Sequence, residues 1–167
     1  MKIIPIDPSS TRTGYAVMTG TQSCDLIDFG LIKPKKTLKA HERVRVMTQA
    51  LESLIETHEP DLILIEMTSG KVNRGRNKGG GAGQSIYGYA VGHIAGRMEK
   101  KVGEDNVDMV FENDWTRGRS KEARAQIVRM CFSKYLSFKG DSGLDVADAI
   151  GIGLWWLERE AYTRGVS

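Results

Sequence analysis

The feature that most constrains the fold is a continuous apolar run at residues 62–65 (LILI), which ends at Glu66. A strand with apolar side chains on both sides must be covered on both faces of its sheet. A second apolar run, at residues 3–6 (IIPI), ends in the same way at Asp7. The sequence therefore predicts a sheet with two buried strands, each of which ends in an acidic residue.

The pattern of the other elements indicates an α/β fold. Short connections join the first strand to two more in a meander, and apolar residues at spacings of three and four predict the helices. The expected strands are residues 2–7, 14–20, 24–32, 62–65 and 107–112, and the expected helices are residues 39–58, 84–101, about 120–136 and about 143–160. This order predicts a mixed sheet with helices on both faces, in a single domain over residues 1–167.

Composition excludes several classes of protein. The net charge is only +3, and 40% of the residues are hydrophobic, so the chain can bury a core. No apolar stretch approaches the ~20 residues that cross a bilayer, and the N-terminal run is too short for a signal peptide. Cys24 and Cys131 lie far apart and are expected as reduced thiols. We therefore expect a soluble, cytoplasmic protein without a membrane partner.

Four acidic residues form the candidate site. Asp7 and Glu66 each follow an apolar run, whereas Asp145 and Asp148 share one face of an expected helix. Clustered carboxylates repel one another, and divalent cations such as Mg²⁺ remove that cost. Two ions roughly 3.5–4 Å apart can activate a water and stabilise the leaving oxygen in phosphodiester cleavage. The set therefore indicates a two-metal hydrolase, provided that the four groups converge.

Each acid also has a purely structural interpretation. Asp7 precedes Pro8 and can start a turn, and Glu66 can simply end a strand. Ser142 and Asp145 have the spacing of a capping box, in which Asp145 would only hold a helix start. These alternatives stay open for each residue, although their coincidence is less expected than a shared site.

Three sequence blocks resemble one known family. Residues 1–18 (MKIIPIDPSSTRTGYAVM), 60–67 (PDLILIEM) and 144–154 (LDVADAIGIGL) are similar to the first hairpin, the fourth strand and the last helix of RuvC-type Holliday-junction resolvases. The resemblance implies a ribonuclease-H-like fold with sheet order 3-2-1-4-5, a homodimer, Mg²⁺ dependence (with Mn²⁺ as the alternative ion) and paired nicks across a four-way junction. It assigns metal binding and catalysis to Asp7, Glu66, Asp145 and Asp148.

The chain departs from that family's pattern in three places. Pro5 stands where a glycine is usual, and a proline removes a donor from the sheet, so we expect a local bulge or an unpaired amide. Ser9 replaces the usual glycine after Asp-Pro. The stretch after Glu66 has no aromatic wedge before Tyr87, which leaves strict preference for junctions open.

Basic residues gather where DNA would lie. A Gly-rich loop at residues 68–83 carries four of them beside the acids and is suited to phosphates, with a solvated loop as the alternative. In a second cluster, at the entry to the third helix, Lys121 is the candidate for a catalytic lysine near the scissile phosphate. The candidate DNA-binding residues are Lys71, Arg74, Arg76, Lys78, Arg117, Arg119, Lys121 and Arg124.

Two other features admit a plainer interpretation. Trp115, in the same segment as the second basic cluster, either stacks on a base or anchors the core. A third cluster, Lys33, Lys35, Lys36 and Lys39, is best interpreted as a solvated face.

Glycines recur every four residues along the second expected helix, at Gly88, Gly92 and Gly96. A glycine costs about 1 kcal/mol against alanine inside a helix, so such a stripe indicates close approach of another backbone. That backbone is either the sheet beneath or the same helix of a second subunit. The family resemblance favours the second, and a two-fold dimer would place two identical sites across a four-way junction.

The resulting hypothesis is a structure-selective DNA endonuclease that resolves four-way junctions with two metal ions per site. The first alternative is a nuclease of the same fold that acts on flaps, forks or RNA–DNA hybrids. The second is an ATP-binding protein of the actin and sugar-kinase fold, whose phosphate loop also follows a strand with Asp-x-Gly-Thr. That alternative needs two such domains and a glycine that this chain lacks after Pro8.

Overall fold

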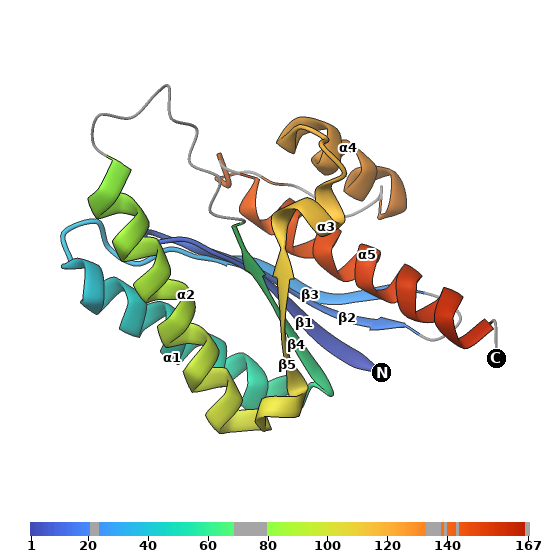
Figure 1. The fold of residues 1–167 in the computed structure, drawn as a ribbon, viewed down its shortest axis with the longest axis horizontal. Coiled ribbons are helices and arrows are strands. Elements are labelled where there is room, and N and C mark those ends of the chain that lie inside the picture. The colour runs from blue at the N-terminus through green and yellow to red at the C-terminus, as the bar shows by residue number, and fades with distance from the viewer. Residues whose placement is uncertain (21–23, 69–79, 133–137, 139, 143, 166–167) are drawn as a thin grey trace.

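A computed structural model describes residues 1–20, 24–68, 80–132, 138, 140–142 and 144–165. Its centre is a five-stranded sheet of order β3-β2-β1-β4-β5 (Figure 1). The strands are β1 (Lys2–Pro8), β2 (Thr13–Gly20), β3 (Cys24–Ile32), β4 (Leu62–Met67) and β5 (Val107–Phe111). β1 pairs antiparallel with β2 and parallel with β4, so the expected mixed sheet and its order are confirmed.

Helices cover both faces of this sheet, as expected. Figure 1 shows α1 and α2 on one face, and α3, α4 and α5 on the other. Their bounds are α1 (Ala40–His58), α2 (Gly80–Val102), α3 (Glu112–Thr116), α4 (Lys121–Cys131) and α5 (Asp145–Gly165), with a 3₁₀ turn, η1, at Glu104–Asn106. Within the described ranges, no helix is long and apolar enough to span a membrane.

The two faces of the sheet have separate cores. Leu62 and Leu64 pack with the α5 side, whereas Ile63 and Ile65 pack with the α1 and α2 side. All four are buried. The continuous apolar run of β4 therefore arises because alternate side chains enter opposite cores.

Pro5 interrupts the pairing of β1 with β2, but the bulge that we considered there is absent from the β1–β2 register. Pro5 is in register with Leu64 of β4, but the β1–β2 ladder has no partners assigned at Ile4 and Pro5. The register is the same on both sides of this gap, so the proline interrupts the ladder without a bulge. The shift in register lies instead between β2 and β3, at Val17 and Met18.

Several element bounds also differ from the expected ones. The segment after β5 turns into the short helix α3, which the sequence pattern did not predict because five residues carry too little periodicity. α2 begins at Gly80, inside the expected loop, and α4 already ends at Cys131. α3 matters most here, because it positions Trp115.

Candidate active site

Asp7 and Glu66 lie side by side at the ends of two parallel strands. Their preceding residues, Ile6 and Ile65, are in register, and each acid is 7% exposed. Burial, and then the charge of Glu66, raise the pKa of Asp7 well above its usual range. Burial also raises the pKa of Glu66, against the lowering effect of its hydrogen bonds. The buried Oδ2 of Asp7 has no hydrogen-bond partner.

Asp145 and Asp148 enter the same region from the first turn of α5, and both are buried. The Asp141 side chain accepts a hydrogen bond of 2.8 Å from the backbone N–H of Val146 and so caps this helix. The structure thus gives the capping role to Asp141. Asp145 and Asp148 lie close enough to the strand-end acids for their charges to raise the pKa values of Asp7 and Glu66 respectively.

Gly14 allows α5 to begin so close to the sheet. It pairs with Asp7 in the β1–β2 ladder, and a Cβ built on it would fall on the backbone carbonyl of Asp145. Any side chain at this position would therefore displace the start of α5 from β2. Sequence reasoning did not single out Gly14, although a glycine in a strand can mark close approach of another backbone.

Three basic side chains neutralise the two helical acids. The Arg12 guanidinium forms an ion pair with the Asp145 carboxylate. Lys121 Nζ lies 3.3 Å from Asp145 Oδ1 and 3.1 Å from Asp148 Oδ2. Burial opposes its charge, but the charges of Asp7, Asp148 and Asp145 raise the pKa of Lys121, so it stays protonated.

Arg124 is the third of these cations, and it is buried. Its Nε and Nη2 donate to the two oxygens of Asp148 at 2.8 and 2.7 Å. Its Nη1 also donates to the carbonyl of Arg119 at 2.8 Å. The phosphate contact that we expected of Arg124 would require this buried pair to open, so the structure points to a role within the site.

Trp115 connects the two pairs of acids. Its indole N–H donates a hydrogen bond of 2.9 Å to Glu66 Oε1, and its ring lies 4.9 Å beneath the Arg124 guanidinium. Glu66 and Asp148 are thereby joined through one indole and one guanidinium. Sequence reasoning considered Trp115 as a core anchor or a stacking residue. It is indeed buried, but sequence reasoning missed its bond to Glu66, as it missed Arg12 and Asp141.

The donor set suits a hard divalent cation. It consists of carboxylate oxygens, which Mg²⁺ and Mn²⁺ prefer, and Asp7 presents a buried oxygen without a partner. Within the described ranges, no three acidic, His or Cys side chains already form a cage around a common point. The side chains of Asp145 and Asp148 are instead held by Arg12, Lys121 and Arg124. If all four acids bind a metal ion, the carboxylates of Asp145 and Asp148 would exchange these basic side chains for the metal cation.

The other expected site residues lie in three environments. Lys71, Arg74, Arg76 and Lys78 lie outside the described residues. Arg117 and Arg119 are exposed in the connection between α3 and α4. Tyr87 lies at another rim of the site, where its hydroxyl accepts a hydrogen bond of 3.1 Å from the backbone N–H of Thr68. It is the first aromatic residue after Glu66, although it comes from α2.

Similar proteins share both the sequence pattern and the fold. A Mycobacterium crossover junction endodeoxyribonuclease RuvC (strain KMS) is 25% identical over 92% of this chain and 81% of its own length. The RuvC of Renibacterium salmoninarum is 27% identical over 44% of this chain, a match that spans only 39% of that relative.

Solved structures of low identity agree in fold. Thermus thermophilus RuvC, in complex with a Holliday junction substrate, superposes with a TM-score of 0.72 at 19% identity, over 98% of this chain and 96% of that one. Fowlpox virus resolvase, in complex with Holliday junction DNA, gives a TM-score of 0.59 at 16% identity, over 95% and 98%. The expected ribonuclease-H-like fold is confirmed by these neighbours.

The family model described as "Crossover junction endodeoxyribonuclease RuvC" matches residues 3–155, which include all four acids and nearly the whole chain. The chain belongs to the RuvC family of crossover junction endodeoxyribonucleases.

Proposed function

We propose that this chain is a metal-dependent endonuclease that cuts branched DNA, with four-way junctions as its main substrate. The observation that carries the proposal is the meeting of four buried acids from β1, β4 and α5 at one end of the sheet. The family match supports it, as do neighbours in complex with Holliday junctions.

Asp7, Glu66, Asp145 and Asp148 would hold two Mg²⁺ ions, with Mn²⁺ as the alternative. Bound divalent ions supply Lewis acidity for phosphodiester hydrolysis. Asp7 would be one of the residues that hold the ions, because its carboxylate interacts with both Glu66 and Asp145. The protonated Lys121 is about half exposed, so its ammonium can stabilise charge that develops on the phosphate.

The decisive experiment compares Asp7→Asn with the parent chain on labelled four-way junctions. We expect binding to be retained and cleavage to be lost, because the substitution removes a metal ligand but leaves the basic surface in place. Asp25→Asn is the matched control, since Asp25 is an exposed acid on β3. Full cleavage by Asp7→Asn would contradict the proposal.

The same assay on flaps, forks, linear duplex and RNA–DNA hybrids addresses the first alternative. Within the described residues, two aromatic side chains lie beside the segment after Glu66: Tyr87 accepts a hydrogen bond from Thr68, and Phe111 is in register with Met67. Equal cleavage of flaps and junctions would favour the broader nuclease. The family match over residues 3–155 favours either nuclease over an ATP-binding protein.

The proposed enzyme would act as a homodimer through α2. Gly88, Gly92 and Gly96 are exposed, and a Cβ built on any of them meets nothing within 4 Å. The stripe is therefore not explained by close packing against the sheet, which was one of the two interpretations left open. The remaining interpretation is that the stripe packs against a second subunit. A two-fold dimer of this kind would bring two sites onto one junction.

A further inference from the structure

A groove runs beside the acidic site, between the α3–α4 connection and the outer side of α5. Two adjoining cavities of about 250 and 370 Å³ form it, and Arg117, Trp155 and Glu158 line both. Trp115 and Arg119 line the first as well. Arg159 and Tyr162 complete the second.

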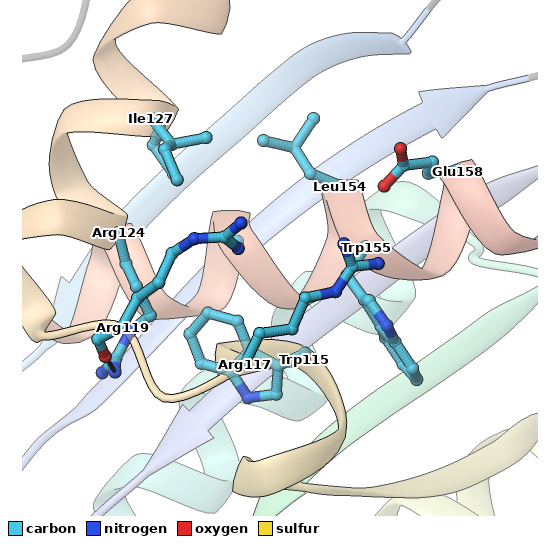
Figure 2. A pocket seen from close by; sticks show the side chains of 10 residues that line it. Trp115, Arg117, Arg119, Arg124, Ile127, Leu154, Trp155 and Glu158 are labelled. Carbon is cyan, nitrogen blue, oxygen red and sulfur yellow. Dashed lines mark hydrogen bonds between the residues drawn. The ribbon is translucent and has the colours of Figure 1, made fainter.

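Aromatic rings and guanidinium groups share this groove with aliphatic side chains of α4 and α5, namely Ile127, Val128 and Leu154. Figure 2 shows the side chains of Arg117 and Arg119 reaching from the connection across Trp115 toward α5. Both residues are exposed, and neither side chain forms an ion pair with any residue that the structure describes. On α5, the Arg159 guanidinium lies 5.7 Å from the centre of the Trp155 ring. A cationic groove with stacking surfaces is the usual means of holding single-stranded nucleic acid.

The groove and the acidic site share a wall. Trp115 lines the groove with its ring and donates its indole N–H to Glu66. Arg124 also lines the groove and binds Asp148. A DNA strand with one phosphate at the acids would therefore have its neighbouring nucleotides within reach of the groove.

We propose that this groove binds an unpaired, single-stranded segment of DNA next to the bond that is cut. Arg117 and Arg119 contact phosphates, and the exposed Tyr162 and the half-buried Trp155 stack on bases. The inference rests on the proposed function, because it takes the acids as the place of cleavage. Cavities of about 250 and 370 Å³ are of the size that holds a group as large as one nucleotide base.

Glu158 is the acidic residue among those that line the groove. Its carboxylate repels phosphate but accepts hydrogen bonds from base amino groups. Three arginines, at positions 117, 119 and 159, leave the lining positively charged in spite of it. Glu158 therefore favours a base on its side of the groove, with the phosphates toward Arg117 and Arg119.

The test measures fluorescence anisotropy of a labelled oligodeoxycytidylate of about ten nucleotides, whose bases carry an amino group, in chelator and without divalent ions. We expect the double substitution Arg117→Glu and Arg119→Glu to weaken binding by about tenfold or more. The matched control is Arg45→Glu with Lys100→Glu, which makes the same change of charge on exposed residues of α1 and α2, across the sheet. Unchanged binding by the groove variant, or equal weakening by the control, would overturn the inference.

A second pair of variants separates stacking from packing. Trp155→Leu keeps an apolar side chain and loses the stacking ring, whereas Trp155→Phe keeps a ring. We expect the first to weaken oligonucleotide binding and the second to restore most of it, with circular dichroism confirming that both fold. If the Trp155 variants instead change the mass in light scattering and leave DNA binding intact, the groove is a protein interface and the inference is wrong.

These measurements separate a failure of the groove assignment from a failure of the nuclease proposal. Oligonucleotide binding is measured without cleavage, so Asp7→Asn should bind as the parent does. If the parent chain cuts no branched DNA while the groove variants still lose binding, the groove stands and the nuclease proposal fails. If junctions are cut and the groove variants bind normally, the nuclease stands and the groove assignment fails.

Discussion

At the scale of single residues, Asp7 occupies an unfavourable position in the metal-free protein. One of its oxygens is buried without a partner, and Glu66 lies beside it. An acid with a raised pKa binds its proton more tightly in the folded chain than in the unfolded chain. The free energy of unfolding therefore falls as the pH rises above the ordinary pKa of 3.8.

Asp7→Asn should therefore stabilise the metal-free protein at pH 7. We expect its melting temperature in chelator to exceed that of the parent by a few degrees, since 1 kcal/mol corresponds to roughly 2–4 °C for a chain of this size. The difference should shrink as the pH falls toward 3.8. Added Mg²⁺ should stabilise the parent more than the variant. Differential scanning fluorimetry measures all three, and a variant less stable than the parent at pH 7 would contradict the account.

The second prediction at this scale concerns the indole N–H of Trp115. Trp115→Phe keeps an aromatic ring but removes the hydrogen bond to Glu66. A hydrogen bond to a charged group contributes about 1.5–3 kcal/mol, so we expect junction cleavage to fall by about tenfold or more. Trp156→Phe is the control, because Trp156 is also a buried tryptophan of this core. Equal loss of activity in both variants would indicate a general packing effect.

At the scale of elements, the site depends on how closely the start of α5 approaches β2. Asp141 fixes the first turn of the helix, and Gly14 leaves room for it beside Asp7. The helical acids and the strand-end acids come from different elements. Their relative placement therefore depends on this close contact between a helix start and a strand.

Gly14→Ala should displace the start of α5 and weaken metal binding. The added Cβ would meet backbone atoms of Asp145 and Val146, which cannot rotate away as a side chain can. Gly30→Ala is the control, since the atoms nearest to its added Cβ belong to the Tyr15 side chain. We expect a higher midpoint for Mg²⁺ in cleavage assays of Gly14→Ala alone. A parent-like midpoint would show that the close approach is unimportant.

The sequence predicted the strand-end acids well because apolar runs fix where β1 and β4 end. It also predicted that Asp145 and Asp148 share a helix face. It did not predict α3 or the bond from Trp115 to Glu66, because both depend on tertiary packing of a five-residue helix. The burial of Arg124 was missed for the same reason, since an arginine at a helix start is exposed in most proteins.

At the scale of the whole molecule, the two faces of the sheet carry different features. The α3–α5 face contributes the helical acids, two of their basic partners (Lys121 and Arg124) and the groove. On the other face, α2 carries the open glycine stripe. In the proposed enzyme, α2 would form the dimer contact and the other face would contact DNA, so variants can test the two proposals separately.

Gly92→Leu tests the proposed dimer. The position is open within the chain, so the substitution should leave the fold unchanged and should block only a partner. We expect light scattering to report a monomer and cleavage of a junction to change from paired to single nicks. Gly92→Ala, which adds one methyl group, serves as a milder control. A fully dimeric Gly92→Leu protein would remove the stripe from the interface.

The link from Glu66 through Trp115 and Arg124 to Asp148 limits which substitutions can be accepted during evolution. An indole that serves one acid and supports the cation of another cannot be exchanged alone without loss at both ends. Among descendants of a common ancestor, positions 115 and 124 should therefore change together or not at all. Lineages that have replaced the tryptophan should also carry a different partner for the second aspartate.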